Sequence, residues 1–227
     1  MRRLVAIAFV ALNVCSAMAA DLPGTAPPVL AASPPAWNWS GFYVGAVAGG
    51  GVLQTSWSNA VYGNYSGTNS GDGELVGGTL GWNWQNKSFV LGIEGDLSWA
   101  NLKASNIANC TIDCSTKLNW YDTLRGRIGY TFANSAVMVY VTGGPAFGGL
   151  THNVISVPNS SVKDSETGYV FGAGFEGMIT QHWSAKIEYL VGQFGRELAC
   201  PAGPCTYDNY ANWVRTDLVR GGINYHF

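Results

Sequence analysis

Eight stretches of the chain alternate between apolar and polar residues with a period of two, which is the pattern of β-strands whose two faces meet different surroundings. In the last stretch, Val219, Ile223 and Phe227 share one face, whereas Arg220 and Asn224 share the other. No amphipathic helix is found after residue 38. The predicted strands span residues 41–52, 74–84, 88–99, 118–132, 136–150, 166–179, 183–194 and 214–227.

The connections between these strands alternate in length. Short connections, at 85–87, 133–135 and 180–182, alternate with long ones rich in Asn, Ser, Gly and Thr, at 53–73, 101–117, 151–165 and 195–213. Barrels of the outer membrane show this alternation, with short periplasmic turns and long outer loops. We therefore predict an all-β fold: an eight-stranded antiparallel up-and-down transmembrane β-barrel with both termini in the periplasm.

Composition favours a membrane barrel over a soluble one. Only 11% of the 227 residues are charged, against ~25% in a soluble domain, and 30 residues are glycine. A hydrophobic content of 47% excludes disorder, and 12 basic against 14 acidic residues exclude a binder of nucleic acid. No apolar run reaches the ~20 residues that a spanning helix needs. The apolar strand faces are therefore expected to contact lipid.

The polar face of the strands carries charges. A membrane barrel must turn this face inward, because a basic side chain that faces the hydrocarbon midplane costs ~2 to 4 kcal/mol. A secreted soluble barrel would instead turn its apolar face inward around a ligand. Four acids balance four bases, which predicts a salt-bridged plug; an ion path lined by the same residues is the alternative. The predicted inward residues are Glu94, Asp96, Arg125, Arg127, Glu176, Lys186, Glu188 and Arg220.

The N-terminal region divides into two segments before the barrel domain at 39–227. Residues 1–19 are typical of a signal peptide, with Arg2 and Arg3 before an apolar stretch and a small-x-small site at 17–19. Residues 20–38 contain five of the nine prolines and are predicted to form a periplasmic linker. The protein is therefore expected to be exported.

Four cysteines of the exported chain fall into two close pairs. Cys110 lies near Cys114, and Cys200 lies near Cys205. In an oxidising compartment this spacing favours two small disulfide-closed loops. A zinc site that joins the four thiolates is the alternative, although zinc sites more often use C-x2-C spacing.

No motif indicates a catalytic group, a metal site or a cofactor. The glycine pattern at 172–177 has the letters of a dinucleotide fingerprint, but it lies inside a predicted strand with no helix after it. The three histidines, His152, His182 and His226, lack metal-binding spacing. Serines at 160–165 follow His152 in one long connection, so a lipid-modifying enzyme stays as the less favoured hypothesis. We expect no enzyme activity and no cofactor.

Four motifs carry a family resemblance: WSGFYVGA at 39–46, LRGRIGY at 124–130, YVTGG at 140–144 and GINYHF at 222–227. Together they resemble the small outer-membrane immunogenic proteins of alphaproteobacteria, a porin family related to the OmpA-like eight-stranded barrels. The resemblance implies the cell outer membrane of a Gram-negative bacterium, among its lipid and lipopolysaccharide. It also implies an envelope-integrity role with antigenic surface loops that meet a host or surface ligand. A narrow porin-like channel for ions or small solutes is the alternative function.

Two further expectations come from the resemblance alone. Ile223, Tyr225 and Phe227 resemble the terminal signal that the barrel assembly machinery reads when it inserts the last strand. A mature N-terminus at Ala20-Asp21 resembles those of relatives that are attached covalently to peptidoglycan through the terminal amine. The proline-rich segment would then join the cell wall to the barrel.

Overall fold

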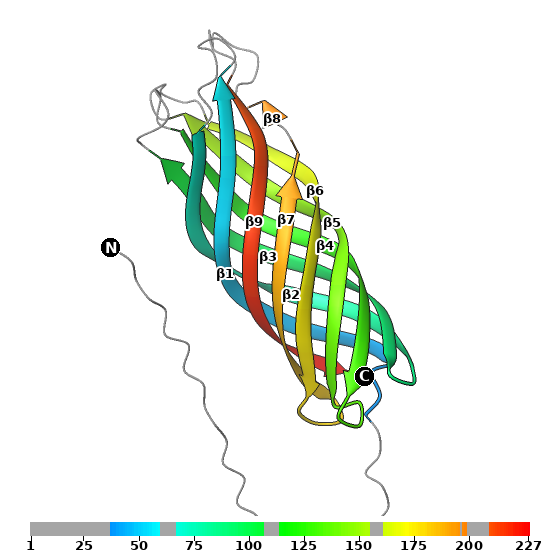
Figure 1. Ribbon diagram of the computed structural model, residues 1–227. Helices are drawn as coiled ribbons and strands as arrows, with labels where there is room; N and C mark the ends of the chain where they lie inside the picture. The colour runs from blue at the N-terminus through cyan, green and yellow to red at the C-terminus, as the bar shows by residue number, and fades with distance from the viewer. Residues whose placement is uncertain (1–36, 60–66, 107–113, 155–160, 196, 199–208) are drawn as a thin grey trace, which may run out of the picture. The chain divides into compact units, whose positions relative to one another are not determined.

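The computed structural model describes residues 37–59, 67–106, 114–154, 161–195, 197–198 and 209–227, which form a closed antiparallel β-barrel (Figure 1). Each long strand pairs with the next, and β1 also pairs with β9, which closes the sheet. The strands are β1 (Gly41–Asn59), β2 (Gly67–Asn86), β3 (Phe89–Asn106), β4 (Cys114–Phe132), β5 (Val137–Val154), β6 (Ser161–Met178), β7 (Trp183–Phe194), β8 (Glu197–Leu198) and β9 (Asn209–His226). The two-residue β8 pairs only with one end of β9, so the barrel wall has eight long strands, as predicted.

Three short turns join β2 to β3, β4 to β5 and β6 to β7 at one end of the barrel, called the turn end. Their positions confirm the predicted short connections to within two residues. Lys87 in the first turn has a φ of 54°, and Ala133, Asn134 and Ser135 in the second have φ between 51° and 62°. The C-terminus lies at the same end, where the Phe227 amide donates a hydrogen bond to the Phe42 carbonyl.

The strands run farther toward the opposite end, called the loop end, than the sequence analysis predicted. β1 continues to Asn59 and β2 begins at Gly67, so most of the connection expected at 53–73 belongs to the sheet. The connections expected at 101–117 and 151–165 are shortened in the same way. The backbone ladders continue because these segments still alternate between side chains that enter the lumen and side chains that leave it.

The side-chain pattern inverts along the strands. Toward the turn end the outer surface is apolar, with Leu97 72% and Phe171 61% exposed, whereas the lumen is charged. Toward the loop end the outward residues are polar, as Lys103 is, whereas the lumen holds apolar residues such as Leu102 and Phe194. The prediction of an apolar exterior around a charged interior is therefore wrong for the loop-end part, where the barrel has the polarity of a soluble protein.

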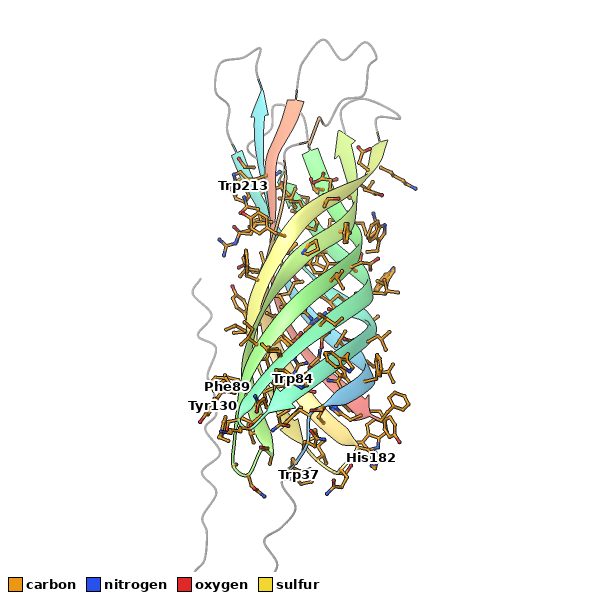
Figure 2. The ribbon with its side chains drawn as sticks, turned by 90° about the vertical axis from the view of Figure 1, so that its right-hand side faces the viewer. Trp37, Trp84, Phe89, Tyr130, His182 and Trp213 are labelled. Atoms are coloured by element: carbon orange, nitrogen blue, oxygen red, sulfur yellow. The ribbon has the colours of Figure 1, made fainter. Side chains whose placement is uncertain are left out.

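Aromatic side chains lie near both limits of the apolar outer surface. Figure 2 shows Trp84, Phe89 and Tyr130 near the turn end and Trp213 toward the loop end. Phe89 and Tyr130 pack edge to face, with ring centroids 5.4 Å apart. Aromatic girdles of this kind mark the two interfaces of a membrane barrel with its bilayer. The apolar surface between them is the part of the barrel that spans the membrane.

Candidate functional site in the barrel lumen

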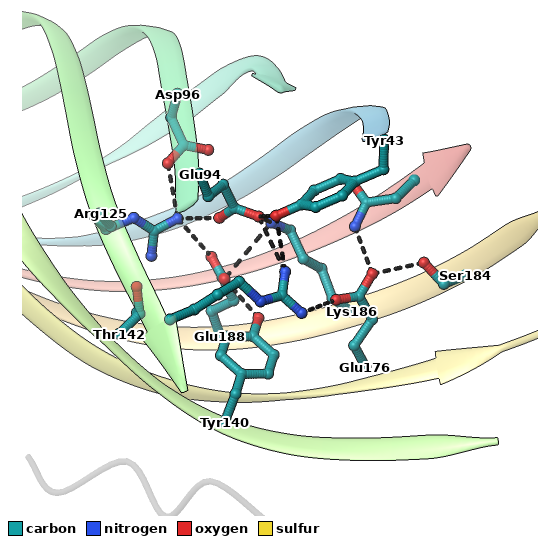
Figure 3. A network of polar contacts seen from close by, with 12 residues as sticks. Tyr43, Glu94, Asp96, Arg125, Tyr140, Thr142, Glu176, Ser184, Lys186 and Glu188 are labelled. Atoms are coloured by element: carbon teal, nitrogen blue, oxygen red, sulfur yellow. Dashed lines mark hydrogen bonds and ion pairs between the residues drawn. The ribbon is translucent and has the colours of Figure 1, made fainter. Parts of the chain in front are cut away.

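The eight predicted inward residues all lie in the lumen, where each is at most 5% exposed. They come from β3, β4, β6, β7 and β9. Figure 3 shows how the charged groups of Glu94, Asp96, Arg125, Glu176, Lys186 and Glu188 converge. The alternation of each strand turns these residues inward, and closure of the sheet brings strands from opposite walls together. We call these eight residues the lumen network.

Glu94 lies at the centre of the lumen network and contacts bases from three other strands, including Arg220 of β9 at 3.8 Å. Its Oε2 lies 2.8 Å from Lys186 Nζ and 3.4 Å from Arg127 Nη1, while its Oε1 accepts a hydrogen bond from Arg125 Nη2. Glu94 is directly opposite Arg125 in the β3–β4 register, but Lys186 comes from β7 across the lumen. One carboxylate thus ties four strands together.

Asp96 and Glu188 form the next pairs of the lumen network. Asp96 Oδ2 lies 2.7 Å from Arg125 Nη2 and 3.0 Å from Arg220 Nη2. The same Arg220 donates from Nε to Glu188 Oε2 at 2.6 Å. Arg125 and Arg220 therefore each bridge carboxylates, and the four acids and four bases of the network balance.

Arg127 joins the lumen network to two tyrosines that the sequence analysis did not assign to it. Its Nη2 lies 2.7 Å from Glu176 Oε2, and its Nη1 donates to the Tyr43 hydroxyl at 2.9 Å. Its guanidinium also lies 4.4 Å from the centroid of the Tyr140 ring, within range of a cation–π contact. The Tyr43 hydroxyl in turn donates to Glu94 at 2.7 Å.

Neutral polar groups satisfy the remaining oxygen of Glu176. Ser184 Oγ and Asn224 Nδ2 each donate to Glu176 Oε1 at 2.6 Å, and His226 Nε2 lies 2.9 Å from Ser184 Oγ. These three residues and both tyrosines are absent from the predicted inward set because that set contains charged residues only, although Asn224 is already predicted on the face of Arg220. Their parity places them on that face, so the alternation itself was the signal that could have found them.

A tryptophan closes the lumen at the turn end. Trp39 is fully buried, donates from its amide to Gln85 Oε1 at 2.8 Å and donates from its indole Nε1 to the Ser135 carbonyl at 2.7 Å. Its ring packs edge to face against His226, with centroids 5.6 Å apart. The residue just before the first strand therefore lies across the mouth below the lumen network.

Apolar side chains fill the lumen on the other side of the lumen network. Tyr121 and Phe194 pack edge to face there, with ring centroids 5.9 Å apart. The cluster, called the apolar layer, consists of Leu53, Leu75, Ala100, Leu102, Ala104, Leu118, Tyr121, Ala146, Leu150, Val170, Leu190, Phe194, Val214 and Leu218. Side chains of the described residues thus occupy the lumen at three successive levels, namely Trp39, the lumen network and the apolar layer.

The other predicted site residues lie away from the lumen or outside the described residues. Ile223 and Phe227 point outward near the turn end, and Tyr225 packs against both Trp183 and Phe227 at centroid distances of 5.2 Å. Of the cysteines, only the backbone of Cys114 is described, as the first residue of β4; Cys110, Cys200 and Cys205 lie outside the described residues. Ala20 and Asp21 also lie outside them, as do the signal peptide and most of the linker.

The described residues also bear on metal binding. Among them, no group of three or more His, Cys, Asp or Glu side chains is arranged to hold a metal ion.

Comparison with known proteins places this geometry in a family. The family model for an outer membrane protein beta-barrel domain matches residues 7–227. The chain belongs to the outer membrane protein β-barrel family. It is 32% identical to the 31 kDa outer-membrane immunogenic protein of Brucella melitensis, with full coverage of both chains. It is 29% identical to the 25 kDa outer-membrane immunogenic protein of Brucella abortus, over 93% of this chain and 91% of that one.

Among solved structures, this member of the outer membrane β-barrel family is similar to Neisserial surface protein A, with a TM-score of 0.47 and 14% sequence identity. The match covers 83% of this chain and 98% of the Neisserial chain. The family and its relatives place the protein in the outer membrane of a Gram-negative bacterium. The turn end of this outer membrane β-barrel therefore faces the periplasm, and the loop end faces outward.

Proposed function

We propose that this outer membrane β-barrel is a closed structural protein of the envelope, with surface-exposed loops, and not a channel or an enzyme. The observation that supports this proposal is the filling of the lumen at three levels by Trp39, the lumen network and the apolar layer. A structural barrel gains stability from a filled interior, whereas a channel needs a continuous aqueous path.

Each level opposes the passage of ions for a different physical reason. In the lumen network, an ion that displaced one member of a buried pair would leave its partner uncompensated, which costs ~3 to 5 kcal/mol. In the apolar layer, an ion would lose most of its hydration shell among packed hydrocarbon side chains, which costs several kcal/mol. At the turn end, Trp39 would have to leave its buried position.

Conductance in planar bilayers tests the closed-barrel proposal. The wild-type protein is expected to insert without unitary current steps, and protease shaving of its loops in the same membranes verifies insertion. Steady steps from the wild-type protein would overturn the proposal. If such steps disappeared in the Glu94→Leu/Arg125→Leu double variant, the alternative of a narrow channel lined by the lumen network would be favoured.

We also propose that the mature N-terminus at Ala20-Asp21 is attached to peptidoglycan. A free terminal amine is the nucleophile that transpeptidation requires, and the proline-rich sequence that follows it leads to Trp39. Because Trp39 is held by hydrogen bonds to Gln85 and Ser135, tension along the linker would reach the barrel at its periplasmic mouth. Sacculi stripped with hot detergent and digested with muramidase should release the protein with a muropeptide on its terminal amine, and a clean, unmodified mass would refute the attachment.

The absence of enzymatic activity is a separate part of the proposal. Homologues are outer-membrane immunogenic proteins, and each carboxylate of the lumen network is paired with a base of the same network. Mass spectra of lipid A from cells with and without the gene should be identical. A gene-dependent loss or gain of an acyl chain would contradict this part of the proposal without affecting the closed lumen.

A further inference from the structure

A row of three lysines crosses the outer surface of the barrel near the loop end. Lys103 of β3 is directly opposite Lys117 of β4, Lys117 is opposite Thr151 of β5, and Thr151 is opposite Lys163 of β6. The residues that flank Lys103 and Lys117 on their strands are buried in the lumen, so these two lysines point outward. Register partners in an antiparallel sheet share a face, so all four side chains point outward. We call these four residues the lysine row.

The lysine row has no anionic partner among the described residues. Like charges directly opposite each other in a sheet are destabilising, because their Cβ atoms lie only ~4.5 to 5.5 Å apart. No described carboxylate forms an ion pair with any of the three lysines, although Asp72 and Glu74 face outward on the neighbouring β2. This arrangement is expected where an external anion binds.

The hydroxyl group of Thr151 adds a neutral donor to the lysine row. Asn119 Nδ2 donates to Thr151 Oγ1 at 2.8 Å, which orients the hydroxyl and leaves its hydrogen available to a further acceptor. Three ammonium groups and one hydroxyl donor match the chemistry of a phosphate, which is anionic and has several acceptor oxygens.

An apolar groove lies on the outer surface closer to the turn end than the lysine row, and Trp120 is its lining residue nearest to Lys117 along β4. Its volume is about 690 Å³, and Leu97, Trp120, Leu124 and Phe147 are among its lining residues. Lys117 lies three residues beyond Trp120 on the same strand, a separation of about 10 Å along the strand. A Cβ atom added at Gly95, on the wall of the groove, would meet no atom closer than 3.9 Å, so a substituted side chain there can extend into the groove.

We propose that the lysine row and this groove form one docking site for a phosphorylated glycolipid of the outer leaflet, lipid A. Its phosphates would contact the lysines, and an acyl chain would occupy the groove. The continuity between the cationic row and the lipid-facing groove favours an amphipathic ligand over a soluble polyanion, which would use the row alone. This site is independent of the closed lumen.

Binding of lipid A to the full-length protein in phosphatidylcholine nanodiscs tests the lysine row. The variant Lys103→Gln/Lys117→Gln/Lys163→Gln is compared with Lys87→Gln, which removes a lysine at the periplasmic end. Diphosphorylated lipid A should bind the row variant about tenfold to 100-fold more weakly than the wild type, and Lys87→Gln should not differ from it. Dephosphorylated lipid A should bind the wild type and the row variant equally. Equal affinity of wild type and row variant for diphosphorylated lipid A would refute the site.

A second pair of variants tests the groove. Gly95→Leu narrows the groove and should weaken the binding of both forms of lipid A. Gly177→Leu adds the same side chain near the periplasmic end, where nothing lies within 4 Å, and should have no effect. Inorganic pyrophosphate and a heparin fragment serve as soluble polyanions. If either bound the lysine row as tightly as lipid A while Gly95→Leu changed nothing, the ligand would be a soluble polyanion and the lipid proposal would be wrong.

Discussion

Replacement of Arg127 by methionine tests whether the lumen network is a dry, tightly coupled plug. Arg127 is the only Arg or Lys within 4.0 Å of Glu176 among the described residues, at 2.7 Å. Glu94 also loses a contact at 3.4 Å, but it keeps Lys186 and Arg125. The substitution therefore leaves the buried Glu176 carboxylate without an Arg or Lys partner, with His226 Nε2 at 3.7 Å as its remaining basic neighbour, and makes the balanced lumen network net negative. Methionine retains most of the apolar volume, so the change is mainly one of charge.

The expected loss in the free energy of unfolding is about 3 to 5 kcal/mol, the cost of leaving one member of a buried ion pair uncompensated. The double variant Arg127→Met/Glu176→Gln restores the balance of charge and should recover more than half of that loss. The two single variants and the double variant form a cycle that isolates the energy of this pair.

Urea titration of the protein folded into lipid vesicles, followed by the fluorescence of its nine tryptophans, measures these changes. Arg215→Met is the matched control, because Arg215 pairs with Asp217 at a similar distance, 2.8 Å, but on the outer surface with a side chain 46% exposed. The control should unfold at the wild-type urea concentration. If Arg127→Met and Arg215→Met behaved alike, the lumen would contain enough water to screen its charges, and the plug would be refuted.

Three further predictions concern the ends of the barrel. Trp39→Ala should lower the free energy of unfolding by about 3 to 5 kcal/mol in the same titration, because it empties a fully buried site. An unchanged midpoint would show that Trp39 is not needed to stabilise the turn end of the barrel. Phe194→Ala in the apolar layer should cost a similar ~3 to 5 kcal/mol, whereas Gln193→Ala, on the outer face beside it, should cost little. Phe227→Ala should leave the unfolding midpoint unchanged, since that side chain is 76% exposed, but should reduce the amount of heat-modifiable barrel in the outer membrane of cells. Normal assembly of this variant would show that Phe227 is not part of the assembly signal.

The sequence was sufficient for those features that depend on neighbouring residues of one strand. Alternation along 214–227 separates Arg220 from Val219 and so decides which side chains share a face. The cost of a charge in hydrocarbon then decides which face enters the lumen. The strand count and the short turns followed from the same local signals, and the structure agrees with them.

The loop-end extensions of the strands, such as 53–59 of β1 and 100–106 of β3, lie beyond the predicted bounds although the alternation continues into them. At 100–104, Ala100, Leu102 and Ala104 alternate with the polar Asn101 and Lys103, but the content of Asn, Ser and Thr predicts a long connection over 101–117. Beyond the bilayer the outer surface meets water, so the same alternation carries polar residues outward and apolar residues inward.

The partners within the lumen network were decided by the tertiary structure alone. Glu94 and Lys186 are 92 residues apart in sequence, and nothing local to either residue specifies that they meet at 2.8 Å. The same holds for Tyr43 and Arg127, which are 84 residues apart. Alternation determines that a side chain points into the lumen, whereas its neighbours across the lumen depend on the register and closure of the whole sheet, because a shift in the pairing of one strand would change every contact that its side chains make.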